Sequence, residues 1–272
     1  FSVCDRVHAA EMSEAAKSKS RSQLSPWRGA IKTTTLKCKD YIMDIREFSS
    51  RIESRIYIAD VHYQTIRCLC YDAREWGMHS VQVFPNMVHL CTPILKDTAV
   101  KVMALNAWSY NGFTAEQKGF EAASSKRAGA DGVQTMVMTT ELKSGHLDNI
   151  DAEMHAVREA LPNGIVQFCL EMEYLNDQEL ENACKLAVKN KIDHLVTSTG
   201  YFFRYNKNRE QVPFVTTVED IQKIRSFVGN DVGVVAQGNV LDAALAASLM
   251  EAGADIVATR RARELCEEFS KG

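Results

Sequence analysis

Apolar and polar residues follow two different periods along this chain, and the two periods alternate. Short apolar or β-branched runs, such as residues 81–84 and 165–170, predict buried strands. Longer stretches between them carry an apolar residue every three or four positions, which predicts helices with one buried face. In residues 147–161, four apolar side chains fall on one such face: Ile150, Met154, Val157 and Leu161.

The expected elements form about eight strand–helix units. Strands are expected at residues 31–36, 81–84, 100–105, 133–139, 165–170, 194–197, 232–236 and 256–259. Helices are expected in two patterns within 40–78, and at 114–129, 147–161, 177–189, 217–227 (opened by a Thr217/Asp220 capping box), 243–252 and 261–269. The succession favours a closed (β/α)8 barrel, the TIM barrel, over residues 30–272. An open doubly wound sheet is the alternative, but no G-x-G-x-x-G follows the first strand.

Residues 1–29 differ from the rest of the chain. They are rich in Ser, Ala, Lys and Arg and have no core-forming period, which predicts an extended arm ahead of the barrel. Presequences for mitochondrial import are Arg- and Ser-rich, and the chain begins with Phe. We therefore expect a mitochondrial location, with a cytoplasmic one as the alternative; truncation of the sequence would also explain the Phe.

Bulk composition narrows the range of functions. The chain has 272 residues, of which 46% are hydrophobic and 25% charged, as in ordinary globular proteins. A net charge of −3 predicts no attraction to nucleic acid, and no apolar run is long enough to span a membrane. The eight cysteines form no C-x-x-C pair, so we expect buried thiols, no metal site and no cofactor.

Residues 192–201, I-D-H-L-V-T-S-T-G-Y, have the pattern of a barrel strand that ends at the mouth of a pocket. The apolar run is followed by three hydroxyl residues and a glycine, which deliver polar groups and a tight turn. His194 lies two residues before Val196, so both side chains are expected to face the barrel interior. There we expect His194 to be a hydrogen-bonded core residue.

Seven stretches, in the same order, resemble the deoxyribose-phosphate aldolase family. They are I-K-T-T-T-L-K at 31–37 (family I-D-x-T-x-L-K), V-Q-V-F-P at 81–85, G-A-D-G-V-Q-T-M-V-M at 129–138 with L-K-S-G at 142–145, C-L-E-M-E-Y-L at 169–175, T-S-T-G at 197–200, T-V-E-D-I at 217–221 with D-V-G-V at 231–234, and E-A-G-A at 251–254. The resemblance covers residues 31–262 apart from insertions at 38–60 and 202–214. It implies a TIM barrel that forms a Schiff base with its substrate through a lysine.

The resemblance also maps the chemical groups of the family onto residues of this chain. The Schiff-base lysine falls on Val196, the second lysine on Val235 and the proton-relaying aspartate on Gln134. The strand-one aspartate, the strand-two cysteine and a strand-five lysine fall on Lys32, Gln82 and Gln167. Imine formation needs an amine of lowered pKa, and valine has none. We therefore expect no catalytic residues and predict that the protein is not an enzyme.

The position of the first barrel strand has an alternative. If this strand lies at residues 56–61, Asp60 becomes the strand-one aspartate. That alignment restores one acid but not the nucleophile.

The phosphate site of the family, a Gly-Gly turn and a serine pair, corresponds here to Gly238–Asn239 and to Arg260 and Arg261. Two arginines at the start of a helix would suit an anion, which predicts a residual anion site made of Gly238, Arg260 and Arg261. The alternative is a surface pair bound to acidic side chains.

Residues around the expected mouth offer further candidates. Glu171 matches a family glutamate and is expected to line the pocket together with Glu173, whereas Lys143 is expected to be solvated. The bulky loop at 108–111 would fill the pocket or present an aromatic contact. The aromatic and basic insert at 201–214 is the expected partner contact, along with the arm at 1–29. A loop that packs on its own barrel is the alternative for the insert.

The main hypothesis is therefore a non-catalytic, aldolase-like barrel that serves as a structural or accessory subunit of a larger mitochondrial assembly. The alternative is a deoxyribose-phosphate aldolase-type lyase or a sugar-phosphate-binding enzyme with altered chemistry, using Glu171, His194 or the arginines. A ligand-sensing or cytoskeleton-regulating role is a third possibility that the sequence neither favours nor excludes. The oligomeric state is not predicted.

Overall fold

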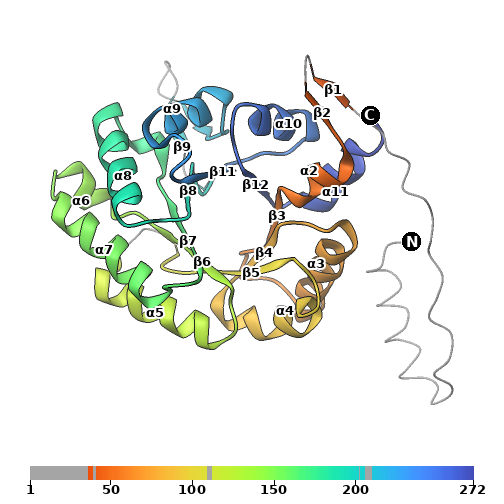
Figure 1. Cartoon of the computed structure of the whole chain (residues 1–272), viewed down its shortest axis with the longest axis horizontal. Helices are drawn as coiled ribbons and strands as arrows, with labels where there is room; N and C mark the ends of the chain where they lie inside the picture. The colour runs from red at the N-terminus through yellow and green to blue at the C-terminus, as the bar shows by residue number, and fades with distance from the viewer. Residues whose placement is uncertain (1–35, 39–40, 109–111, 202, 206–209) are drawn as a thin grey trace.

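The structure is a computed structural model that describes residues 36–38, 41–108, 112–201, 203–205 and 210–272. Eight parallel strands close into a barrel, and helices surround it (Figure 1). In spatial order the barrel strands are β3 (Ile52–Arg55), β4 (Ser80–Val83), β5 (Lys101–Leu105), β6 (Gly132–Met136), β7 (Ile165–Cys169), β8 (His194–Val196), β11 (Gly233–Gln237) and β12 (Ile256–Thr259). The predicted TIM barrel is confirmed. The open sheet is excluded because β12 pairs with β3.

Helices follow the strands as the apolar spacing predicted. They are α3 (Tyr63–Trp76), α4 (Val88–Leu95), α5 (Ala115–Arg127), α7 (Leu147–Ala160), α8 (Asp177–Lys189), α9 (Val218–Val228), α10 (Ala243–Glu251) and α11 (Ala262–Phe269), with the shorter α2 (Ile45–Ser50), α6 (Thr139–Lys143), η1 (Pro85–Met87) and η2 (Met172–Tyr174). The capping box predicted at Thr217 and Asp220 opens α9, where the Thr217 hydroxyl accepts from the Asp220 amide. Each helix buries its apolar face against the outward-facing side chains of the barrel strands.

The first barrel strand is not where the sequence placed it. Residues 31–35 lie outside the described residues, and β1 (Leu36–Cys38) pairs antiparallel with β2 (Tyr41–Met43) in a ribbon separate from the barrel. The strand that completes the barrel is β3, whose sequence I-E-S-R is too short and too polar to be recognised by its pattern. The alternative at residues 56–61 is also wrong, and Asp60 is exposed. The strand-one acid is therefore Glu53. The predicted boundary between arm and barrel stays untested.

A buried ion pair fixes two helices to the barrel. Lys118 of α5 and Glu153 of α7 are fully buried, and their charged atoms lie 2.5 Å apart. Lys118 also donates to the carbonyl of Met136, and Glu153 accepts from the amide of Met138. Because every charge has a partner, the pair can be accommodated in the core.

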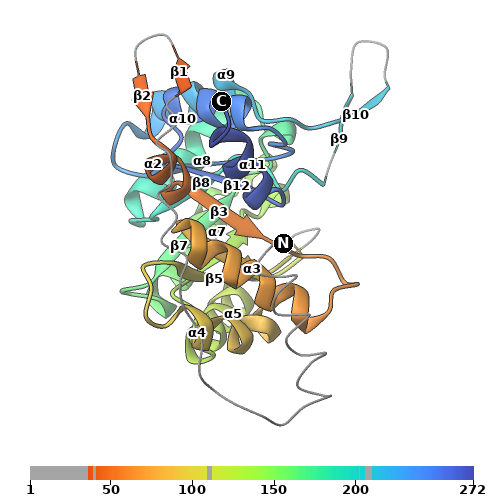
Figure 2. The same cartoon turned by 90° about the vertical axis from the view of Figure 1, so that its right-hand side faces the viewer.

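The 201–214 insert contains a second ribbon. Strands β9 (Phe203–Tyr205) and β10 (Gln211–Pro213) pair antiparallel and extend from the side of the barrel toward which β3 points (Figure 2). Its role as a partner contact stays a prediction, as does that of the 1–29 arm, which lies outside the described residues. Cys70, Cys91, Cys169, Cys184 and Cys266 are free and buried, as expected, whereas Cys68 is disulfide-bonded. Across the described part of the chain, no helix is long and apolar enough to cross a membrane.

Candidate functional site

The barrel interior is divided into a polar and an apolar part. On the polar side, Ser80 donates to Glu53 at 2.7 Å, and Gln82 donates to Gln134 at 2.7 Å. Glu53 is fully buried, and burial raises its pKa more than the bond from Ser80 and the charge of Arg55 lower it. An oxygen of Glu53 and both polar atoms of the Gln167 side chain have no partner among the described residues.

Val196 and Val235 lie on the apolar side. They are register partners on the neighbouring strands β8 and β11, and both are fully buried. They pack in an interior cluster completed by Met136, Cys169, Ile256 and Ala258. His194 faces the same interior nearer the start of β8, opposite His79 at 6.5 Å between ring centres, and burial lowers the pKa of both imidazoles. One nitrogen of His194 has no hydrogen-bond partner.

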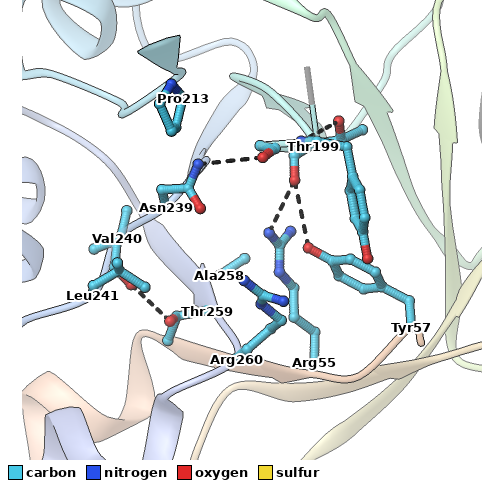
Figure 3. A pocket seen from close by; sticks show the side chains of 12 residues that line it. Arg55, Tyr57, Thr199, Pro213, Asn239, Val240, Leu241, Ala258, Thr259 and Arg260 are labelled. Carbon is cyan, nitrogen blue, oxygen red and sulfur yellow. Dashed lines mark hydrogen bonds between the residues drawn. The ribbon is translucent and has the colours of Figure 1, made fainter. Parts of the chain in front are cut away.

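A cavity of about 280 Å³ opens where strands β3, β8, β11 and β12 end. This is the carboxyl-terminal face of the barrel, where substrates bind in barrels of this kind. The lining residues shown in Figure 3 come from those strands and the loops after them: Arg55, Tyr57, Thr199, Gly200, Tyr201, Pro213, Asn239, Val240, Leu241, Ala258, Thr259 and Arg260. The T-S-T-G turn and the Gly238–Asn239 turn are thus neighbours in this wall.

Arg55 is the most unusual residue of the cavity. Its side chain is only 4% exposed, yet Nε and Nη1 have no hydrogen-bond partner. Nη2 donates to the carbonyl of Thr199 at a long 3.4 Å, and the guanidinium lies 4.8 Å from the ring centre of Tyr57. A buried cation with so few partners is costly. Such a group at a cavity wall indicates a site for an anion.

Arg260 supplies a second positive charge to the same cavity. The register of β12 with β3 pairs Thr259 with Ser54, which places Arg260 beside Arg55 on the neighbouring strand. Figure 3 shows both side chains at the base of the cavity. Arg260 is exposed to solvent, and an anion held between Arg55 and Arg260 would be attracted by both charges.

The Gly238–Asn239 turn is shaped by close contacts. Gly238 has φ +125°, and a Cβ there would lie 2.8 Å from the ring of Phe214, so only glycine fits. The Asn239 amide donates to the carbonyls of Gly200 and Phe214, at 3.2 and 2.7 Å, and ties this turn to the T-S-T-G turn. Arg261 points elsewhere: it donates to the carbonyl of Leu241 and forms an ion pair with Glu268. Of the three residues predicted to form an anion site, Arg260 lines the cavity and Gly238 shapes its wall. Arg261 instead binds an acidic side chain at the surface, which was the alternative prediction.

Two carboxyl groups meet behind the T-S-T-G turn. The Ser198 hydroxyl lies 3.0 Å from Glu171 and 2.8 Å from Glu173, and the amide of Thr199 donates to Glu171 at 2.9 Å. Burial, and then the neighbouring carboxylate of Glu171, raise the pKa of Glu173 to about 8. Glu171 has a left-handed backbone, φ +50°, a strained conformation that is most often retained at functional sites.

Three aromatic rings form one cluster at the mouth. The rings of Tyr57, Trp108 and Tyr201 lie 4.9–5.4 Å apart, centre to centre. Trp108 therefore makes aromatic contacts with the two tyrosines that line the cavity, whereas residues 109–111 of its loop lie outside the described residues. Lys143 is half-exposed, as expected, and donates to Tyr174 and Glu179.

Comparisons with known proteins agree with this geometry, although no protein-family model matches the chain. A deoxyribose-phosphate aldolase from Thermoanaerobacter pseudethanolicus is 34% identical over 209 residues, 76% of this chain and 89% of that protein. One from Aciduliprofundum boonei is 33% identical over 227 residues, 83% and 98% of the two chains. This chain belongs to the deoxyribose-phosphate aldolase family. The resemblance seen in its motifs is thereby confirmed.

Solved structures give the same fold. The aldolase QR15 superposes with a TM-score of 0.75 at 25% identity, covering 82% of this chain and 96% of that one. A deoxyribose phosphate aldolase from Aeropyrum pernix superposes with a TM-score of 0.72 at 21% identity, covering 83% and 92%.

The prediction that this family member is not an enzyme is contradicted. Relatives that share 30–34% of its residues over most of the chain are named as an enzyme, and no finding shows a loss of catalysis. The error has a physical reason. Val196 and Val235 lack the amine that forms an imine, but the loss of one route to carbonyl activation does not by itself show the loss of catalysis, and the cavity is lined by other polar groups, among them Arg55 and Arg260.

Arg55, Tyr57 and Glu53 were not predicted as site residues from the sequence, and all three omissions have one reason. All three belong to or follow β3, and the first strand of the deoxyribose-phosphate aldolase pattern was assigned about twenty residues too early. The signal was present: I-E-S-R at 52–55 begins with the same apolar–acidic pair as the family pattern I-D-x-T.

Proposed function

We propose that the protein is an aldolase-type lyase, or a related sugar-phosphate-binding enzyme with altered chemistry, that acts on a small phosphorylated carbonyl compound. The observation that carries the proposal is the pair Arg55 and Arg260, which face one cavity at the catalytic end of the barrel. Membership of the deoxyribose-phosphate aldolase family supports the reaction class.

The phosphate is the part of the substrate that the two arginines would hold. A phosphate monoester carries up to two negative charges, which match two guanidinium groups on neighbouring strands. The unpartnered nitrogens of Arg55 would gain partners, and the repulsion between Arg55 and Arg260 would be relieved. Neither Arg55 nor Arg260 has an acidic partner within ion-pair distance among the described residues, so both charges are available to a ligand.

Proton transfer is assigned to the carboxyl pair. Cleavage of an aldol requires a base that takes the hydroxyl proton while the carbon–carbon bond breaks and its electrons move onto the carbonyl, followed by return of a proton to carbon. Glu173, with a pKa near 8, still holds a proton at neutral pH, while Glu171 accepts from Ser198 and Thr199. The pair lies behind the T-S-T-G turn and not among the residues that line the cavity, so a proton would pass between it and the substrate through the hydroxyl groups of that turn. Among the described residues, no lysine lines the cavity, so the proposed reaction runs through acid and base groups and not through an imine.

Calorimetry with 2-deoxyribose 5-phosphate and inorganic phosphate tests the binding part of the proposal. We expect both ligands to bind, and Arg260→Met to weaken both. Lys185→Met is the matched control, since Lys185 lies on α8 in an exposed pair with Glu181 and should leave the affinities unchanged. No heat of binding at millimolar ligand would refute the proposal.

Borohydride reduction in the presence of 2-deoxyribose 5-phosphate tests the chemical part. We expect no reduced adduct at any residue of the cavity while the substrate is consumed. An adduct on a lysine would show that imine chemistry is retained through a residue outside the assigned site.

The cellular location is a separate part of the proposal. A mitochondrial location is inferred only from the Arg- and Ser-rich composition of residues 1–29. Import of a reporter fused to residues 1–29 into isolated mitochondria supports it, and retention of the reporter outside contradicts it.

A further inference from the structure

The aromatic cluster at the mouth is a feature that a small sugar phosphate does not require. Tyr57 and Tyr201 both line the cavity, and Trp108 contacts both rings at 4.9 and 5.4 Å. The three rings contact one another, so the wall formed by Tyr57 and Tyr201 is in place before any ligand binds. Binding to a preformed wall costs little conformational entropy.

Tyr201 keeps much of its surface uncovered. Its side chain is 45% exposed, although the ring belongs to a cluster and lies next to two arginines. An exposed aromatic ring at the edge of a cavity provides a flat surface on which another flat ring can stack.

The other side of the cavity is mostly apolar. Figure 3 shows Pro213, Val240 and Leu241, together with the polar Asn239, on one side and Tyr57 on the other, with Arg55 and Arg260 between them at the base. A mostly apolar slot above two cations fits a ligand with two unlike ends. One end is an anion, and the other is flat and weakly polar.

We propose that this cavity binds a phosphate monoester that carries a planar heteroaromatic ring, such as a nucleoside 5′-monophosphate, with the phosphate on Arg55 and Arg260 and the ring against Tyr201. The inference rests on the proposed function in one respect, which is that phosphate esters bind at these arginines. It goes further by naming the second half of the ligand. The aromatic wall and the unpartnered nitrogens of Arg55 are independent observations, and both belong to residues that line the same cavity.

Two probes that share the phosphate and the deoxyribose carbons test this inference. In thymidine 5′-monophosphate the base replaces the anomeric hydroxyl group of 2-deoxyribose 5-phosphate, so the difference between the two affinities, measured before any turnover of the sugar phosphate, reports mainly the base. Stacking of a base on an aromatic side chain strengthens binding about 5- to 100-fold. Calorimetry should therefore give a dissociation constant lower by that factor for the nucleotide, together with quenching of Trp108 fluorescence.

Tyr201→Leu should remove this advantage, so that the two probes bind the variant with affinities within about twofold of each other. Tyr63→Leu is the matched control: Tyr63 is an exposed tyrosine on α3 that does not line the cavity, so the advantage should persist. Equal affinity of the wild-type protein for the two probes overturns the inference and leaves the proposed function standing. Failure of both probes and of inorganic phosphate to bind overturns the two together.

Discussion

Replacement of Arg55 by methionine should weaken anion binding and make the folded protein more stable. Arg55 has two nitrogens without partners, and a hydrogen bond to a charged group contributes about 1.5–3 kcal/mol. Two such bonds to a phosphate are worth about 3 kcal/mol or more, so Arg55→Met should raise the dissociation constant of phosphate roughly 100-fold.

The expected gain in stability follows from the hydrogen-bond partners that the buried Arg55 lacks. Burying a cation costs several kcal/mol, and here the observed compensation is one 3.4 Å hydrogen bond, a contact with the Tyr57 ring and an attraction to the buried Glu53 carboxyl group without an ion-pair contact. A cation–π contact returns only about 1–2 kcal/mol. The penalty is the larger effect, so we expect the free energy of unfolding of Arg55→Met to rise by about 1 kcal/mol or more. A residue kept at the expense of stability is typical of a binding site.

Urea denaturation and phosphate calorimetry on the same samples measure both effects. Lys185→Met serves as the control for loss of a positive charge and should change neither quantity by more than about 0.5 kcal/mol. The reasoning is refuted if Arg55→Met destabilises the fold by about 2 kcal/mol while phosphate affinity stays the same. Arg55 would then be a structural cation, with its partners inside the protein.

Three further variants test other parts of the account. Lys118→Met should destabilise the fold by about 3–5 kcal/mol, because it leaves Glu153 buried without its cation; unchanged urea denaturation would contradict the role of that pair. Glu173 has a pKa raised from about 4.5 to about 8, so the folded state holds a proton that the unfolded state has lost, and this group makes stability fall as pH rises from about 4.5 to 8. Glu173→Gln should flatten that fall, by at most about 1.4 kcal/mol per pH unit, and equal slopes for both proteins would show that Glu173 does not hold the proton. Thr217→Ala should cost about 1 kcal/mol through loss of the cap of α9, with Ser226→Ala, near the other end of the same helix, as the control.

The fold could be predicted because its signals are local and repeated. The barrel strands from β4 to β12 are mostly apolar or β-branched, and each following helix has an apolar face, so an error in one unit leaves the others intact. The first strand failed because I-E-S-R has two polar residues facing the barrel interior, Glu53 and Arg55. In a barrel, such residues are placed by pairing with β12 and β4, and this pairing is not visible in a local pattern.

Local sequence patterns also limited which residues of the site could be predicted. The T-S-T-G turn and Arg260 were predicted because motifs carry them, and the structure places both at one cavity. Arg55 reaches that cavity from a strand about 200 residues away in sequence, so only the closed barrel brings it next to Arg260. The prediction of missing catalysis, made from the missing lysines, was wrong for a related reason. It rested on the positions where lysines are absent and not on the polar side chains that the fold brings together at the cavity.

The most direct test of the central claim is turnover of 2-deoxyribose 5-phosphate, followed by NMR and compared with samples that contain no protein. The account predicts release of acetaldehyde and glyceraldehyde 3-phosphate, or formation of another product from the same substrate, by the wild-type protein and by Lys185→Met. It predicts a loss of at least about 100-fold in the rate at limiting substrate for Arg55→Met. Persistence of the unchanged substrate with the wild-type protein, or equal rates for wild type and Arg55→Met, would contradict it.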